Sequence, residues 1–153
     1  DVFAYTAARL AGGIINFEGV GPEYPVSEIV TFETTHGTVA PGRAEGEIAG
    51  CTKHFGGAGT NIDVDEFEKT GIVYGDMTHV TIVKNGETLF DQDVLYHKSF
   101  GFVPECGPIL YNGSTTPTIA LSLNKRSFAE KFLPHIFDTG ENFGDYKITI
   151  VKK

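Results

Sequence analysis

The segment that most restricts the fold is residues 77–96, MTHVTIVKNGETLFDQDVLY. Its two arms are rich in β-branched and aromatic residues, which favour extended structure. Asn85 and Gly86 lie between the arms, and both tolerate the positive φ that a tight hairpin turn requires. The segment therefore predicts an antiparallel β-hairpin.

Shorter β-rich runs bounded by turn residues occur in the rest of the chain. Further strands are expected at 28–34, 47–52, 107–113, 116–123 and 145–153. The 19 glycines, 12 phenylalanines and 6 tyrosines also favour short strands joined by frequent turns. Residues 35–46, THGTVAPGRAEG, are expected to form a loop.

Three short helices complete the predicted elements. Asp1 can cap an alanine-rich helix that ends at Gly12-Gly13. Asp63, three residues before Glu66, resembles a capping box that starts a helix ending at Gly71. Asn124 can cap a third helix over 125–137. The elements predict a mainly β fold, an antiparallel barrel or sandwich.

Composition excludes several function classes. The chain has 153 residues, a net charge of −8 and a pI of about 5.0, so counterion release from nucleic acid cannot drive binding. We therefore expect no nucleic-acid partner. We also expect no membrane partner, because no apolar run approaches bilayer length, and we expect a cytoplasmic location. Cys51 and Cys106 are expected to be reduced thiols, since two cysteines provide no disulfide framework.

The glycine-rich stretch KHFGGAGTN, residues 53–61, could in principle hold a phosphate. A Walker loop, however, places its Lys after the glycines, and a dinucleotide fingerprint requires a parallel βαβ unit. The five histidines have no zinc-binding spacing, and no hydroxyl or thiol lies in a nucleophile elbow. The residues alone indicate neither a metal site nor a self-sufficient catalytic set.

The stretch HFGGAGTNI, residues 54–62, resembles the F-G-N-x-x-T-N-I motif of the S-adenosyl-L-methionine hydroxide adenosyltransferase family. That family also includes the fluorinase and the chlorinase. The segment VFAYTAARLAGG (2–13) is similar to the family's D-V-F-A-x-x-A-A-H-L-A-x-G helix. GDMTHVTI (75–82) is similar to its hairpin, and SLNKRSFA (122–129) to its A-V-N-x-G-x-A segment.

The family has two domains, an N-terminal α/β/α domain and a C-terminal β-barrel joined by an inter-domain helix. The resemblance implies that residues 1–33 are the helix and connection, and that 34–153 are the barrel. The implied fold is a Greek-key-like antiparallel β-barrel with an N-terminal helix and two short helices. Catalytic residues would lie in the N-terminal domain, so none is expected in this chain.

The resemblance also implies a binding site. Family members are trimers in which S-adenosylmethionine lies between the N-terminal domain of one subunit and the barrel of its neighbour. The positions carried over as S-adenosylmethionine- or adenosine-binding are Thr52, Phe55, Gly57, Tyr96, Thr115, Asn124 and Lys125. Gly57 stands where the motif has Asn, and residues 114–118, STTPT, replace the methionine-binding N-S-x-G-Y segment.

The implied function is hydrolysis of S-adenosyl-L-methionine to adenosine and L-methionine, with no cofactor and no metal. The chain would supply the nucleoside pocket, would be inactive alone, and would act with its N-terminal α/β domain in a homotrimer. The alternative is a diverged, non-catalytic module that binds a nucleoside or forms oligomers. Its motivation is the two departures from the family pattern, at Gly57 and at residues 114–118.

Overall fold

The computed structural model describes residues 2–31, 34–53 and 56–153. The chain divides into two compact units, residues 1–33 and residues 34–153. The first unit contains helix α1 (Val2–Ala11) and two 3-10 turns, η1 (Glu18–Val20) and η2 (Val26–Glu28). None of the residues in these three segments is buried.

The predicted N-terminal helix is confirmed by α1. It ends where the Gly12 N–H donates to the Ala8 carbonyl oxygen at 2.9 Å and Gly13 takes a φ of +65°, a conformation that glycine adopts without strain. Its expected cap, Asp1, lies outside the described residues. The strand expected at 28–34 is wrong over its described residues: Glu28 ends the 3-10 turn η2, and residues 29–31 and 34 form no regular element.

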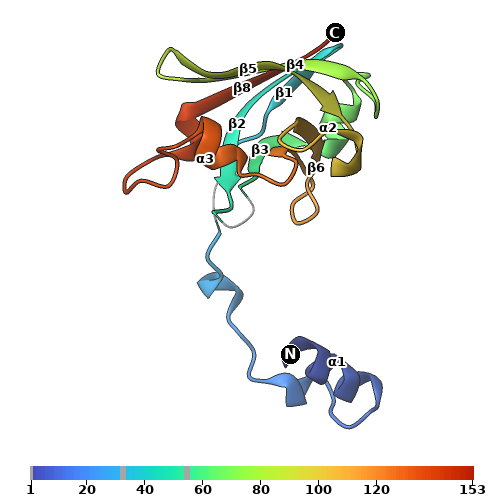
Figure 1. The fold of residues 1–153 in the computed structure, drawn as a ribbon. Coiled ribbons are helices and arrows are strands. Elements are labelled where there is room, and N and C mark those ends of the chain that lie inside the picture. The colour runs from blue at the N-terminus through green and yellow to red at the C-terminus, as the bar shows by residue number, and fades with distance from the viewer. Residues whose placement is uncertain (1, 32–33, 54–55) are drawn as a thin grey trace. The chain divides into compact units, whose positions relative to one another are not determined.

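The second unit is a β-barrel (Figure 1). Its strands are β1 (Thr38–Ala40), β2 (Arg43–Cys51), β3 (Ala58–Asp63), β4 (Met77–Lys84), β5 (Glu87–Tyr96), β6 (Pro108–Asn112), β7 (Thr118–Leu123) and β8 (Tyr146–Lys152). Their order is β1-β2-β3-β7-β6-β5-β4-β8, and β2 also pairs with β8. This last pairing closes the seven strands β2 to β8 into a ring, in which each strand has two neighbours, and β1 pairs with β2 outside the ring.

The expected mainly β barrel is therefore confirmed, with one difference in strand direction. The strand pairs are antiparallel except β5 and β6, which are parallel, with Leu95 opposite Ile109 and Tyr96 opposite Leu110. A parallel neighbour needs a crossover, and residues 97–107, which include the 3-10 turn η3 (Phe100–Phe102), provide it.

The hairpin at 77–96 is confirmed as β4 and β5. Its turn residues Asn85 and Gly86 have φ values of +51° and +84°, as a turn with two left-handed residues requires. The loop expected at 35–46 is wrong in part, because β1 and the start of β2 occupy it. Residues 43–47 are held there by pairing with β8, about a hundred residues later in the chain.

Two expected helix caps are also corrected. Helix α2 (Val64–Glu68) begins after Asp63, but the Asp63 side chain does not cap it. Helix α3 (Phe128–Phe132) is capped by Ser127, whose Oγ accepts the Glu130 N–H at 3.1 Å. The Asn124 side chain instead donates to the Val103 carbonyl oxygen at 2.9 Å.

The core fills the barrel with apolar side chains from strands and helices. Its largest fully buried members include Ile48, Ile62 and Tyr146 from strands, and Phe67 and Phe128 from helices. None of the helices in the described part of the chain has the length and apolar character needed to span a bilayer. Cys51 and Cys106 are free thiols.

Candidate functional site

A large open groove in the barrel unit is the candidate site. Its volume is about 1260 Å³, and it is lined by the segment before β1, the ends of β2 and β3, and the chain around β6 and β7. Most of the lining side chains are polar or small. The groove is large enough to hold a small organic ligand, and its polar groups converge on one surface.

Five of the residues carried over from the family resemblance line this groove: Thr52, Gly57, Thr115, Asn124 and Lys125. They come from three regions of the sequence, 52–57, 115 and 124–125, which the pairing of β2 with β3, β3 with β7 and β6 with β7 brings together. Phe55 lies outside the described residues.

Tyr96 is not among the residues that line the groove in the described chain. It is buried, its ring packs edge-on against Phe67 at 5.2 Å between centroids, and its hydroxyl donates to Asn112 Oδ1 at 2.7 Å. Burial raises the pKa of the Tyr96 hydroxyl. Tyr96 therefore acts here as a core residue with a satisfied hydroxyl.

Gly57 is flanked by two hydroxyl groups. A Cβ at this position would lie 3.3 Å from Ser122 Oγ and 3.4 Å from Tyr111 OH, closer than ordinary van der Waals contact. Burial raises the pKa of Tyr111, so its phenol is neutral at pH 7 and can donate a hydrogen bond. Where the family motif has an amide side chain, this groove therefore presents a phenol and a hydroxyl.

An aromatic wall lies beside these hydroxyls. The rings of Phe100 and Tyr111 have centroids 5.2 Å apart, and both side chains line the groove. Phe100 is 39% exposed, so part of its side chain is accessible to a ligand. Neither residue was predicted from the sequence as part of a site. The sequence feature that could have identified Tyr111 is its position directly before Asn112-Gly113, at the end of a predicted strand.

One part of the groove carries cations. Lys125, which has a φ of +62°, lies next to Arg126, and both approach the Glu105 carboxylate, at 3.7 Å and 3.3 Å respectively. All three side chains are exposed, so these ion pairs are weak and leave the cations free to turn toward an anionic ligand.

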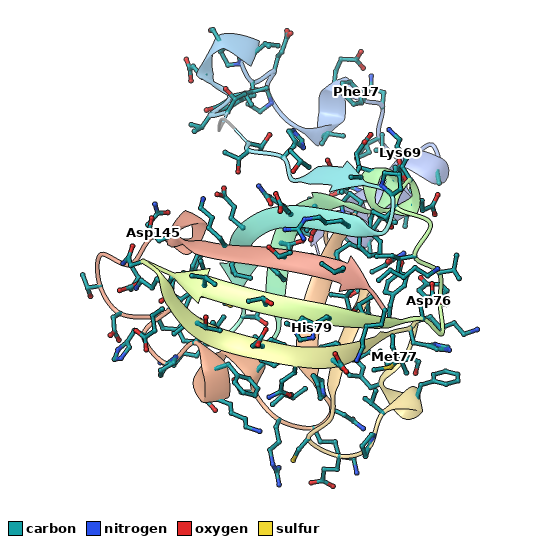
Figure 2. All side chains as sticks on the ribbon, turned by 90° about the horizontal axis from the view of Figure 1, so that it is seen from above. Phe17, Lys69, Asp76, Met77, His79 and Asp145 are labelled. Atoms are coloured by element: carbon teal, nitrogen blue, oxygen red, sulfur yellow. The ribbon has the colours of Figure 1, made fainter. Side chains whose placement is uncertain are left out.

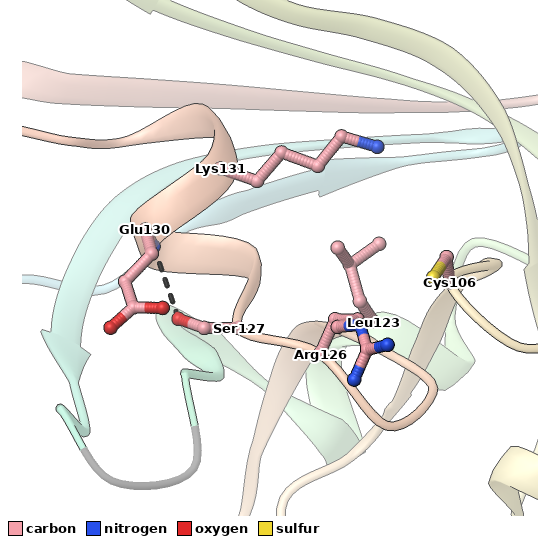
Figure 3. Close-up of a pocket in the computed structure, with 6 residues that line it drawn as sticks. All are labelled: Cys106, Leu123, Arg126, Ser127, Glu130 and Lys131. Atoms are coloured by element: carbon pink, nitrogen blue, oxygen red, sulfur yellow. Dashed lines mark hydrogen bonds between the residues drawn. The ribbon is translucent and has the colours of Figure 1, made fainter.

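A smaller pocket of about 360 Å³ adjoins this cationic part and shares Leu123, Arg126, Ser127 and Glu130 with the groove (Figure 3). Figure 3 shows the Ser127 side chain bonded to the first turn of α3. Cys106 and Lys131 also line the smaller pocket. The Ser127 cap thus holds the wall between the two cavities.

A histidine and a carboxylate meet elsewhere on the groove wall. His36 Nδ1 lies 2.8 Å from Asp63 Oδ2, although 27 residues separate them. Such a separation matches no short motif, which is why sequence spacing did not identify the pair. Cys51 also lines the groove, but burial raises the pKa of its thiol to about 12, so it is not a thiolate nucleophile at neutral pH.

No protein-family model matches the chain, and no curated protein matches it. Among solved structures, the chain is similar to an uncharacterized conserved protein from Thermotoga maritima. The TM-score is 0.60 and the identity 22%, over 99% of this chain and 51% of that one. This likeness shows the fold alone.

A second solved structure, a conserved hypothetical protein from Thermus thermophilus, matches with a TM-score of 0.45. Its identity is 26%, over 97% of this chain and 50% of that one. The chain thus spans about half the length of each of these two proteins.

Proposed function

We propose that this chain is the nucleoside-binding part of an enzyme that hydrolyses S-adenosyl-L-methionine to adenosine and L-methionine. The observation that carries the proposal is the convergence of Thr52, Gly57, Thr115, Asn124 and Lys125 on one groove. These positions follow from the family resemblance and not from the geometry, and they lie far apart in the sequence. Their meeting at one surface supports a shared ligand.

Adenine is proposed to bind beside Gly57. The Phe100–Tyr111 wall offers a stacking face, and base–aromatic stacking contributes about 1–3 kcal/mol. Tyr111 OH and Ser122 Oγ lie next to the place of a Cβ at residue 57, so they would replace the family's amide side chain as hydrogen-bonding partners for the ring nitrogens.

The methionine end is proposed to lie toward Lys125 and Thr115. The ammonium group of Lys125 would attract the ligand carboxylate, and the Thr115 hydroxyl keeps the hydrogen-bonding function of the family's Ser. The Asn124 amide N–H₂ group donates one hydrogen to the Val103 carbonyl oxygen, so the amide oxygen and the second N–H would be the groups offered to the ligand.

The chemistry of the complete enzyme would be attack by water or hydroxide on the ribose C5′ carbon. The sulfonium is a good leaving group, so the protein mainly has to position the nucleophile in line with the C–S bond and exclude bulk water. The barrel would contribute shape, stacking and hydrogen bonds. The groups that position the nucleophile would come from an N-terminal α/β domain, in a homotrimer.

The proposal is tested first by adenosine binding to the chain, measured by titration calorimetry. Tyr111→Phe removes one hydrogen bond at the base and is expected to weaken binding by about tenfold, which corresponds to about 1.4 kcal/mol. Tyr74→Phe, a matched change at a tyrosine outside the groove, is expected to leave affinity unchanged.

Turnover is tested with the full-length protein, by chromatography of S-adenosylmethionine reactions for adenosine and methionine. Production of both supports the hydrolase. Adenosine binding without turnover would favour the alternative, a non-catalytic nucleoside-binding module, which the changes at Gly57 and residues 114–118 motivate. Absence of both binding and turnover would overturn the proposal.

A further inference from the structure

The His36–Asp63 pair has a third member. Thr34 Oγ1 lies 3.5 Å from His36 Nε2, and His36 Nδ1 lies 2.8 Å from Asp63 Oδ2. The three side chains all line the groove. We propose that Thr34, His36 and Asp63 form a hydroxyl–imidazole–carboxylate set that gives the groove an acyl-transfer activity of its own, toward small carboxylic esters.

The hydrogen bonds determine which imidazole nitrogen can accept a proton. An ionised Asp63 carboxylate is only an acceptor, so the proton of a neutral His36 must lie on Nδ1. The lone pair then lies on Nε2, the nitrogen that faces the Thr34 hydroxyl. This is the arrangement in which a base removes the proton of a nucleophile while a third group orients the base.

The segment that carries Thr34 and His36 is held against β3 by hydrogen bonds. The Gly37 N–H donates to the Asn61 carbonyl oxygen at 2.8 Å, and Asn61 Nδ2 donates to Thr35 Oγ1 at 3.1 Å. The Thr35 hydroxyl in turn donates to Glu47. The segment that carries the set is therefore anchored to β3 and to Glu47 on β2.

Close packing at Gly37 strengthens this support. A Cβ on Gly37 would lie 2.6 Å from Ile62 Cγ1 and 2.8 Å from the Glu45 carbonyl oxygen. Only glycine allows the backbone to approach β3 so closely. The position of His36 next to Asp63, at the end of β3, follows from that approach.

Other histidine–aspartate pairs lack these features within the described residues. His135 Nδ1 lies 3.0 Å from Asp138 Oδ2, but neither residue lines the groove. His79 directs both ring nitrogens at carboxylates, Asp93 and Asp91, so it has no nitrogen left for a nucleophile.

The reaction balances with water as the only co-reactant. Thr34 Oγ attacks the ester carbonyl carbon while its proton passes to His36 Nε2, and the alcohol leaves with that proton when the tetrahedral intermediate collapses. Water then attacks the acyl-threonine, again through His36, and the returned proton restores the Thr34 hydroxyl. The net change is ester plus water to acid plus alcohol.

The test uses the full chain and p-nitrophenyl acetate, with nitrophenol release and mass spectrometry of peptides as readouts. We expect an acetyl group on Thr34. We also expect Thr34→Val and His36→Gln to lower the rate by about 100-fold, the lower end for a positioned general base. Thr34→Ser keeps a hydroxyl and should retain activity.

Asp63 is a positioning residue, so its variant has a different signature. Asp63→Asn should lower kcat with little change in KM, because the amide no longer fixes the imidazole tautomer. His135→Gln serves as the matched control and should leave the rate unchanged. Melting temperatures of all variants exclude loss of fold as the cause.

Three results would overturn the proposal: acetylation only at residues other than Thr34, wild-type rates in Thr34→Val, or an equal loss in His135→Gln and His36→Gln. The outcome does not depend on S-adenosylmethionine hydrolysis, since neither the ester nor the readouts involve a nucleoside.

Discussion

Glycines at two positions, Gly37 before β1 and Gly46 in β2, decide how closely their segments approach β3. At Gly46, as at Gly37, a Cβ would collide with the neighbouring strand, here with Asn61 Oδ1 and with Ile62 Cγ1, the latter at 2.8 Å. Asn61 Oδ1 also accepts the Glu47 N–H at 2.9 Å. A side chain at 46 would therefore disturb the amide that anchors Thr35.

Gly46→Ala is expected to lower the free energy of unfolding by about 1–3 kcal/mol, as overpacking in a closely packed site does. Urea unfolding followed by circular dichroism measures it. Gly50→Ala on the same strand is the control, because a Cβ there meets nothing within 4 Å. Equal losses of stability in the two variants would show that strand propensity, and not the collision, causes the effect of Gly46→Ala.

Asp63 shows which part of a residue's role can be predicted from its neighbours in the sequence. The sequence places it at the start of a helix, and α2 does begin there, yet its carboxylate pairs with His36 in place of the helix N–H groups. Helix position is a local property, but the choice between two hydrogen-bond partners depended on a segment 27 residues away.

At the scale of elements, threonine side chains complete the bonding where strands lose register. The pairing of β3 with β7 shifts between Gly59 and Asp63. Within this irregularity Thr60 is 1% exposed, donates to the Ile119 carbonyl oxygen at 2.7 Å and accepts the Ile62 N–H at 3.2 Å. One hydroxyl thereby satisfies two buried backbone groups that the ladder leaves unpaired.

Thr60→Val, nearly identical in shape, removes both bonds. We expect the free energy of unfolding to fall by about 1–3 kcal/mol, because buried polar groups are left without partners. Thr88→Val, at an exposed position on β5, is the control and should be within about 0.5 kcal/mol of wild type. A stable Thr60→Val protein would mean that the strands realign to pair these groups.

Element prediction succeeded where the signal is local. The hairpin at 77–96 follows from its turn residues and composition, and β6, β7 and β8 form within the runs expected for them. β1 and the start of β2 were missed because THGTVAPGRAEG has the composition of a loop, and its strand conformation depends on pairing with β8.

At the scale of the molecule, a charged cluster on the outer surface links three strands. His79 lies on β4 (Figure 2). Its ring nitrogens lie 2.9 Å from Asp91 and 2.8 Å from Asp93, both on β5, and Lys153 after β8 bonds to Asp93. The hydrogen bonds to Asp93 and Asp91 raise the pKa of His79 above its ordinary 6.5. Bonds to Thr81 and His79 lower the pKa of Asp91.

The sign of the pH dependence follows. A raised histidine pKa stabilises the folded protein fully below about pH 6.5 and loses this effect as pH rises through the folded-state pKa. The lowered pKa of Asp91 stabilises the folded protein above the ordinary pKa of 3.8, and this stabilisation is lost as the pH falls through the folded-state pKa. The cluster contributes most between those limits.

We therefore expect His79→Gln to lower the melting temperature most near about pH 5 to 6, and the difference from wild type to shrink toward about pH 9. Calorimetric scans at several pH values measure it. High salt should reduce the difference, since the cluster is exposed. A difference that is constant with pH would mean that the imidazole contributes by packing and not by charge.

The sequence by itself determined the mainly β class, the central hairpin, the first helix and a set of positions that resemble a nucleoside site. These depend on short-range properties: side-chain branching, turn residues, caps and motif order. The tertiary structure alone decided the closure of the barrel through β2 and β8 and the parallel β5–β6 pair.

The tertiary structure also decided which candidates share a surface. Tyr96 lies in the core, whereas Asn124 lines the groove while its amide donates to a loop carbonyl. Tyr111, Ser122 and the Thr34–His36–Asp63 set line the same groove. The physical reason is that burial and hydrogen-bond partners are settled between segments far apart in the chain. No local pattern carries that information.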